Sequence, residues 1–197
     1  MENEELRQAI NLFDTPEKWN AFIELSKHQD RLKQMMTRTA VVRANQYFRQ
    51  EHQVPGWSFM QFSDDKLGMV WYLTAYGENS ICLVLSWGGE FVLEVRNGAN
   101  NVAETTRLLK DSKFSALLGC FERVDTWWDN HFLARERFNF SFGSPSDGHF
   151  GPFRLAWYAH FATESFIEQL GAKVARFQLP EMTALLTELN ALTRKSS

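Results

Sequence analysis

Four segments near the middle of the chain alternate apolar residues with a period of two, which is the spacing of a β-strand. They run over residues 57–62, 69–76, 81–87 and 91–96. The stretches between them are short and rich in turn residues, including Gly88-Gly89 before the last segment. Connections this short permit antiparallel pairing but leave no room for a parallel crossover. The pattern therefore predicts an antiparallel four-stranded meander over 57–96.

Helical spacing of apolar residues, every three or four positions, dominates most of the remaining chain. It predicts helices in three regions, namely 1–54, 101–130 and 163–193. Thr15 followed by Pro16 marks one helix start, because Thr can cap a helix and Pro suits its first position. After the meander, Asn100 or Asn101 can cap the next helix in the same way.

Two later segments return to strand spacing, at 132–142 and 153–161. We interpret them as two further strands, with the alternative that 153–161 begins a helix. The fold class predicted is then α+β, with a mainly antiparallel sheet of about six strands and helices packed on it. No linker divides the chain, so we expect a single domain over 1–197.

Composition places the chain among folded proteins, since 44% of its residues are hydrophobic and 14% are aromatic. The formal net charge is −3, without the basic block of a nonspecific nucleic-acid-binding protein. The acidic start Met1-Glu2-Asn3-Glu4-Glu5 lacks the order of a signal peptide, and no apolar run reaches the length of a membrane span. We expect a cytoplasmic protein with no membrane partner, whose cysteines, Cys82 and Cys120, are buried free thiols.

Cationic and hydrogen-bonding residues alternate outward on the two later predicted strands. If those strands pair, one sheet face carries Arg135, Arg137, Arg154, Tyr158 and His160. Guanidinium groups present fixed forks of donors that suit carboxylate or phosphate groups, so this face is a candidate site for an anionic, nucleotide-like small molecule. The alternative is that these residues form ordinary surface ion pairs with neighbouring carboxylates.

A metal site is a second candidate, built from Asp129, His131 and His149. Imidazole and carboxylate ligands suit Zn, Mn or Fe, and Asp129 and His131 would share one face of a strand. No short paired His motif supports this site, and capping or solvent-exposed roles are the alternative. We therefore predict no cofactor.

The order of helices and strands resembles that of the metal-dependent nuclease core with a Pro-Asp…Asp/Glu-x-Lys signature. The tripeptide at the corresponding place is Glu94-Val95-Arg96, in which Arg replaces the Lys of the family. No Pro-Asp pair precedes it at the usual place. The resemblance covers topology only, and Arg does not act as a base, so it implies at most an inactive relative.

Trp127 and Trp128 are adjacent, so both cannot point into one core from a helix, and one of them is a candidate partner-facing anchor. The sequence carries no phosphate-binding loop, no Gly-x-Ser-x-Gly elbow and no paired Cys or His motif. We therefore expect a non-enzymatic intracellular binding or interaction protein of bacterial or phage type, with a protein partner or a second copy of the chain. The alternative is a ligand-binding domain or enzyme that uses the Arg/Tyr/His face.

Overall fold

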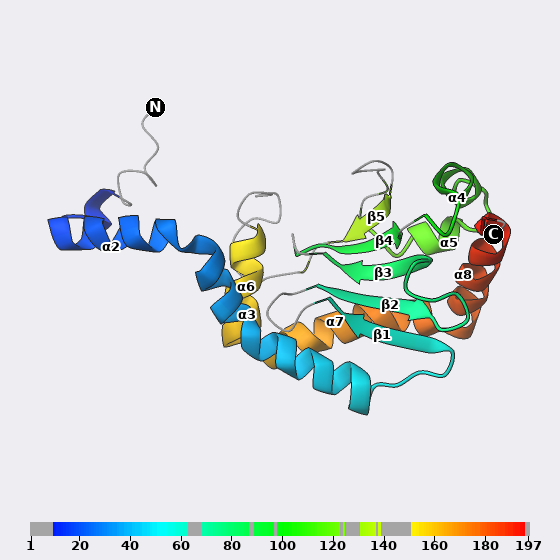
Figure 1. Cartoon of the computed structure of the whole chain (residues 1–197), viewed down its shortest axis with the longest axis horizontal. Coiled ribbons are helices and arrows are strands. Elements are labelled where there is room, and N and C mark those ends of the chain that lie inside the picture. The colour runs from blue at the N-terminus through cyan, green and yellow to red at the C-terminus, as the bar shows by residue number, and fades with distance from the viewer. Residues whose placement is uncertain are drawn as a thin grey trace.

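The molecule combines a central sheet, helices packed on it, and a helical N-terminal arm that projects to one side (Figure 1). The computed structural model describes residues 10–62, 68–86, 89–96, 98–122, 124, 131–136, 138 and 151–195. The N-terminal arm is defined here as residues 10–35, which include α2 (Pro16–Lys27) and the first part of α3 (Gln29–Gln46). Its separation from the sheet is the feature on which the functional argument depends.

The sheet has five antiparallel strands in the order β1-β2-β3-β4-β5, so each strand pairs with its neighbour in the chain. Across β3 and β4, Leu83 is the partner of Leu93. The predicted meander and the strand at the start of 132–142 are therefore confirmed, with five strands in place of about six. The strands are β1 (Trp57–Gln61), β2 (Met69–Leu73), β3 (Ile81–Leu85), β4 (Phe91–Val95) and β5 (Phe132–Glu136).

The predicted strand at 153–161 is wrong, because this segment lies within helix α6 (Gly151–Phe161). Its apolar residues alternate, which misled the interpretation, but burial follows a helical rhythm. Leu155, Ala156 and Ala159 are buried, whereas Trp157 and Phe161 are exposed. Positions three and four apart lie on the same side of a helix, so a narrow buried stripe accounts for this pattern and a strand does not.

Gly89 allows α6 to approach the β3–β4 hairpin closely. Its φ is +80°, as the tight turn requires. A Cβ at this position would lie 2.6 Å from Cδ2 of Leu155 in α6, so any other residue here would force the Leu155 side chain to move. The glycine therefore serves both the turn and the packing of a helix over it.

The helices confirm most of the helical spacing in the sequence. Thr15 caps α2, its hydroxyl oxygen accepting from the Lys18 amide at 3.3 Å, and the side chain of Asn101 caps α4 by accepting from the Glu104 amide at 3.2 Å. Besides α6, the helices are α2 (Pro16–Lys27), α3 (Gln29–Gln46), its π-helical continuation η1 (Tyr47–Glu51), α4 (Val102–Leu109), α5 (Ser115–Leu118), α7 (Thr163–Gln178) and α8 (Pro180–Thr193).

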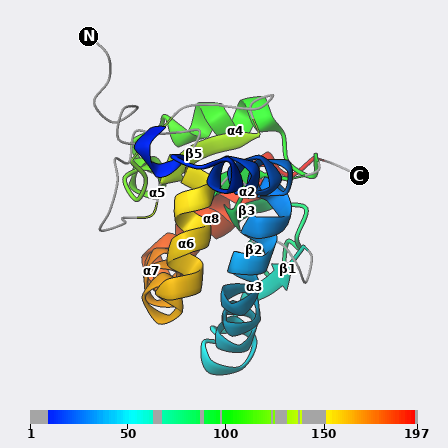
Figure 2. The same ribbon diagram turned by 90° about the vertical axis from the view of Figure 1, so that its left-hand side faces the viewer.

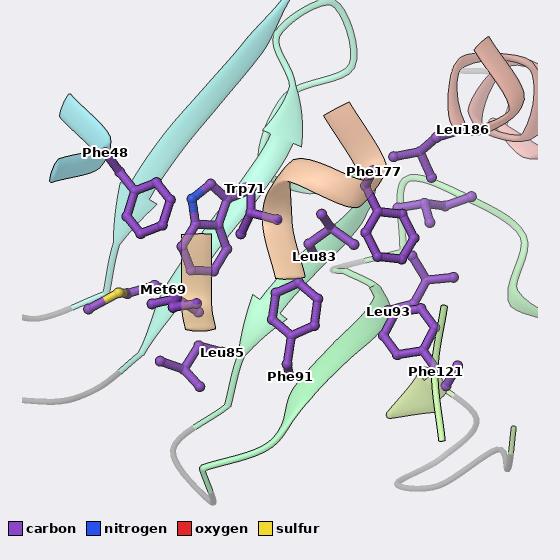
Figure 3. Close-up of a cluster of buried hydrophobic side chains, with 14 of the residues drawn as sticks. Phe48, Met69, Trp71, Leu83, Leu85, Phe91, Leu93, Phe121, Phe177 and Leu186 are labelled. Carbon is purple, nitrogen blue, oxygen red and sulfur yellow. The ribbon is translucent and has the colours of Figure 1, made fainter. Parts of the chain in front are cut away.

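The main core lies between the sheet and helices α3, α7 and α8. Phe177 of α7 lies between two other rings, with centroid distances of 6.4 Å to Phe91 and 5.3 Å to Phe121. Figure 3 shows this group continuing along the sheet to Trp71 and Phe48. Rings and aliphatic side chains in such contact supply most of the stability of a small domain.

The opposite sheet face carries a smaller apolar cluster made by Val70, Cys82, Val84 and Val92. Figure 1 shows this face toward the viewer, and none of the described helices lies in front of it. Its cover comes from side chains of the sheet itself and of the adjoining turns, including Met60, Phe62, Tyr72 and Phe132. The helices thus occupy one side of the sheet, as a two-layer α+β domain requires.

Buried polar bonds attach α8 to the sheet. Asn190 is fully buried, and its side-chain oxygen accepts from the Ile81 amide at the start of β3. Its side-chain nitrogen donates to the carbonyl of Leu186. Asn100 donates in turn to the carbonyl of Asn190 and to the hydroxyl of Thr193. These bonds fix the helix relative to the strand because each broken partner would remain buried and unsatisfied.

Candidate functional site

The residues predicted to form an anion-binding strand face lie on two different elements. Arg135 is on β5, and its Nη1 donates to Oε1 of Glu90 at 3.2 Å. Arg154, Tyr158 and His160 are on α6, where the Tyr158 hydroxyl accepts from Gln169 at 3.0 Å and His160 is exposed. Arg137 lies outside the described residues. The helix at 153–161 removes the shared strand face, and Arg135 pairs with a carboxylate in a contact whose two side chains are each only 17% exposed.

Of the predicted metal ligands, only His131 lies among the described residues; Asp129 and His149 do not. The His131 ring approaches the Val95 carbonyl with its Nδ1 at 2.8 Å. Within the part of the chain that the structure describes, no three His, Cys, Asp or Glu side chains lie together as metal ligands would. The predicted anchors Trp127 and Trp128 also fall outside the described residues.

The two charged residues of the nuclease-like tripeptide, Glu94 and Arg96, lie on the sheet face without helices, whereas Val95 points into the main core. Arg96 approaches Glu94 with 3.8 Å between Nε and Oε1, and its guanidinium lies 4.5 Å from the Phe62 ring centre. Burial raises the pKa of the Glu94 carboxyl, against the lowering effect of Arg96 and His131. Arg96 is thereby placed as a partner for Glu94 and not as a base.

Both cysteines are free thiols, as predicted, although only one is fully buried. Cys82 lies on β3 beneath the smaller apolar cluster, and burial raises its pKa to about 12. Cys120 is half-buried, and burial raises its pKa as well. Thiols held in the neutral form are poor nucleophiles, so neither cysteine is poised for covalent catalysis.

The N-terminal arm is the region that sequence reasoning missed. Helix α2 has a capped start, and its charged side chains pair locally, Lys18 with Asp14 at 2.6 Å and Lys27 with Glu24 at 2.6 Å. None of its twelve residues is buried. The helix therefore forms from local signals alone and adds nothing to the core beneath the sheet.

Large apolar side chains remain exposed along this arm. Trp19, Phe22 and Leu25 recur every three residues on α2 and are 50%, 41% and 55% exposed. Ile10, Leu12 and Met35 are also exposed. Exposed apolar patches of this kind are uncommon on monomeric folded proteins and are often found at interaction surfaces.

An aromatic cluster holds the arm in shape. The Phe13 ring centre lies 5.6 Å from that of Trp19 and 4.9 Å from that of Phe22, and the latter two are 5.4 Å apart. These separations are typical of favourable ring pairs. The contact is pre-formed, which reduces the entropy lost when a partner covers it.

A second apolar surface lies near the arm, on α6. Trp157 is 42% exposed and Phe161 is 63% exposed, and their ring centres are 5.0 Å apart. Figure 2 shows α2, α3 and α6 at the same end of the molecule, facing the viewer. Helix α6 packs against α3, so the α6 aromatic pair and the arm belong to one end of the protein.

A cavity of about 590 Å³ lies at the other side of η1, beside the edge strand β1. Phe48, Phe59 and Trp71 line it with aromatic carbon, and Arg49, His52 and Gln178 supply polar groups. Nε2 of His52 lies 3.0 Å from Oε1 of Gln178. A cavity of this size and mixed lining is typical of ligand sites, and π-helical turns are frequent beside them.

Trp71 carries a buried indole nitrogen without a hydrogen-bond partner among the described residues. Figure 3 shows this nitrogen on the edge of Trp71 that faces the Phe48 ring. The two rings meet edge to face, 4.8 Å apart at 71°. This edge-to-face contact belongs to the main core, so the indole of Trp71 has a structural role.

The comparisons with known proteins assign no family. No protein-family model, curated protein or solved structure matches the chain. Among the described residues, no helix is long and apolar enough to cross a membrane. The arm and the cavity are therefore judged on their own geometry. The stripe of Trp19, Phe22 and Leu25 is visible in the sequence as helical spacing. The spacing does not show that these side chains remain exposed to solvent.

Proposed function

We propose that this chain is a non-enzymatic interaction protein that binds a second copy of itself through the N-terminal arm. The observation that carries this proposal is α2, which buries none of its residues yet presents Trp19, Phe22 and Leu25 to solvent. We expect the exposed apolar side of such a helix to be covered by a partner molecule. No described group of side chains offers a competing catalytic arrangement.

The exposed area is large enough for a stable dimer. Taking about 150–250 Å² for each aromatic side chain, the exposed parts of Trp19, Phe22, Trp157 and Phe161 amount to about 400 Å². That is roughly half of the ~800 Å² that each partner contributes to a standard interface. Exposed aliphatic side chains of the same end, Ile10, Leu12, Leu25, Met35 and Val42, supply the rest.

The placement of the two apolar surfaces suits a twofold arrangement. The arm projects away from the body, and the α6 aromatic pair, Trp157 and Phe161, remains on the body at the same end (Figures 1 and 2). The arm of one copy can therefore cover α6 of the other, and the symmetric contact repeats the same surfaces. Local ion pairs such as Lys33 with Asp30 neutralise the arm, so two copies do not repel each other there.

Sedimentation velocity over about 1–100 µM protein tests the proposal. The wild-type chain is expected to form a concentration-dependent dimer. The double variant Trp19→Ser, Phe22→Ser is expected to raise the dissociation constant at least about a hundredfold, since buried aromatic residues are the usual hot spots. Its free energy of unfolding as a monomer should stay within about 0.5 kcal/mol of wild type.

The matched control is Leu192→Ser on α8, which removes an exposed apolar side chain from a different helix. This control should leave the dissociation constant unchanged. A wild-type protein that remains monomeric at 100 µM, or an arm variant that dimerises like wild type, would contradict self-association through the arm.

A further inference from the structure

The edge strand β1 offers backbone hydrogen-bonding groups that the sheet does not use. The amide of Thr74 donates to the carbonyl of Gly56, and the amide of Phe62 donates to the carbonyl of Gly68. Antiparallel strands bond through alternate residues, so the even-numbered positions of β1 face β2. The N–H and C=O of Phe59 consequently point away from the sheet. Figure 1 shows β1 as the last strand at this edge among the described residues.

This edge opens onto the cavity beside η1. The cavity is bounded by Phe48 and Arg49 of η1 on one side and by Ser58 and Phe59 of β1 on the other. A strand that adds to β1 places the residue opposite Phe59 on the same sheet face as Phe59. That face also carries Trp71, the partner of Phe59 in β2, so the added side chain would enter the aromatic part of the cavity.

The two edges of the sheet differ in their protection against strand addition. The opposite edge strand, β5, carries Arg135 and Glu136, with Arg135 paired to Glu90 and Glu136 paired to Lys173 and Arg176. Such charges are the usual guard of an edge strand. The sequence of β1, Trp-Ser-Phe-Met-Gln, contains no charged residue and no proline. The β1 edge thus lacks the protection that β5 has.

The charge at the cavity favours a peptide with an acidic side chain. Arg49 is exposed, and its guanidinium lies 6.0 Å from the Phe59 ring centre. None of the residues that line the cavity is an aspartate or a glutamate. Among the described residues Arg49 forms no ion pair, whereas Arg43 of α3 pairs with Glu51 and Glu164. An acidic side chain two residues from the apolar one would lie on the same face of an added strand and reach Arg49.

We propose that β1 accepts an extended peptide segment of another protein, in which a large apolar side chain fills the cavity and an acidic residue two positions away pairs with Arg49. Backbone bonds to Phe59 supply part of the affinity, and the cavity and Arg49 select the sequence. This site is separate from the arm, and the proposal does not depend on dimerisation.

Amide hydrogen exchange measured by NMR on the full chain tests the proposal, with the blocked pentapeptide Ac-Thr-Phe-Thr-Glu-Thr-NH₂ as the probe. In the free protein the amides of Ser58 and Met60 should exchange slowly and that of Phe59 quickly. At saturating peptide, the Phe59 amide should slow at least about tenfold, while Ser58 and Met60 change little.

Three changes to the peptide and one to the protein separate the parts of the contact. N-methylation of the peptide Phe removes its donor and should weaken binding about tenfold. Replacement of the peptide Phe by Ser empties the cavity and should weaken binding by at least that factor. Replacement of the peptide Glu by Gln should weaken binding about threefold, as should Arg49→Gln, and the two together should weaken it no further.

Four results would overturn the proposal. They are the absence of binding at about 10 mM peptide, binding that leaves the Phe59 amide unchanged, equal affinity for the N-methylated peptide, and protection of Phe59 that rises with protein concentration alone. The last result would assign the edge to a second copy of the chain. Arg49→Gln does not alter the arm, so this variant should sediment like the wild-type protein. A failure of the peptide site can therefore be distinguished from a failure of dimerisation through the arm.

Discussion

Helices α2 and α7 have similar apolar patterns and different surroundings. Helix α7 (Thr163–Gln178) buries seven residues, including Phe166, Leu170 and Phe177, against the sheet. Helix α2 (Pro16–Lys27) has Trp19, Phe22 and Leu25 at comparable spacing and buries none of its twelve residues. The spacing predicts that a helix forms and has an apolar side, but only the tertiary structure decides whether this chain covers that side.

The polar contacts of the two regions differ in the same way. In the arm, bonds join residues three or four apart, as between Lys18 and Asp14. In the body, Asn190 and Asn100 bond groups about ninety residues or more away. The body is therefore a cooperative unit, whereas the arm depends on local helix formation and on whatever covers it.

The largest expected difference comes from matched aromatic truncations in the two helices. Phe177→Ala should lower the free energy of unfolding by about 3–5 kcal/mol, because it leaves a cavity between Phe91 and Phe121. Phe22→Ala in the arm should change it by less than about 0.5 kcal/mol under monomeric conditions. Urea unfolding followed by far-UV circular dichroism measures both, and similar losses for the two variants would break the distinction between arm and body.

Several elements follow directly from local sequence. Strand alternation and short glycine-containing turns identified β1 to β4, and the caps at Thr15 and Asn101 were read from residue type and position. These signals depend on neighbours within a few residues, so they survive without tertiary information. Asn100 was the other capping alternative, and it is instead buried against α8, which only long-range packing could reveal.

The errors came from features that local pattern does not determine. Leu155 and Ala159 fit an alternating strand and a helical stripe equally well, and α6 is helical because it packs on α3 and over Gly89. The shared strand face proposed for the anion-binding residues is absent for the same reason, because Arg154 and Tyr158 lie on that helix. Binding of an anion by these residues stays a prediction. The cavity beside β1 brings together η1, β1 and Gln178, which no sequence spacing connects.

A smaller effect is expected from the polar bonds that distinguish body from arm. Asn190→Ala should cost about 2 kcal/mol, because the buried amide of Ile81 loses its acceptor, the side-chain oxygen of Asn190. Thr15→Ala removes the cap of α2 and should reduce its helicity without changing the global unfolding free energy. Residue-resolved hydrogen exchange separates the two cases, and a global loss of protection in Thr15→Ala would show that the arm is coupled to the body.

The smallest effect concerns the pH dependence of stability, in which a half-buried carboxyl of the body differs from an exposed one of the arm. Burial raises the pKa of Glu94 in the folded state, despite Arg96 and His131 nearby. The folded protein therefore holds this proton at a pH where the unfolded chain has released it. The contribution of Glu94 to stability is most favourable below the ordinary carboxyl pKa and falls as pH rises through the folded pKa.

Glu94→Gln should remove that fall, so its unfolding free energy relative to wild type should increase from pH 4 toward neutrality. The matched variant Glu24→Gln changes an exposed carboxyl of α2 whose pKa is lowered by the hydrogen bond from Lys27. Because this pair lies in the arm and not in the cooperative body, the variant should leave the global unfolding curve unchanged. Urea midpoints across this pH range measure both variants. If Glu94→Gln follows the wild-type curve, its carboxyl is solvated in the folded state, and the sheet face without helices is more open than the burial of Cys82 and Val92 indicates. If Glu24→Gln shifts the curve instead, the arm contributes to the cooperative unit, and the contrast between α2 and α7 is one of degree.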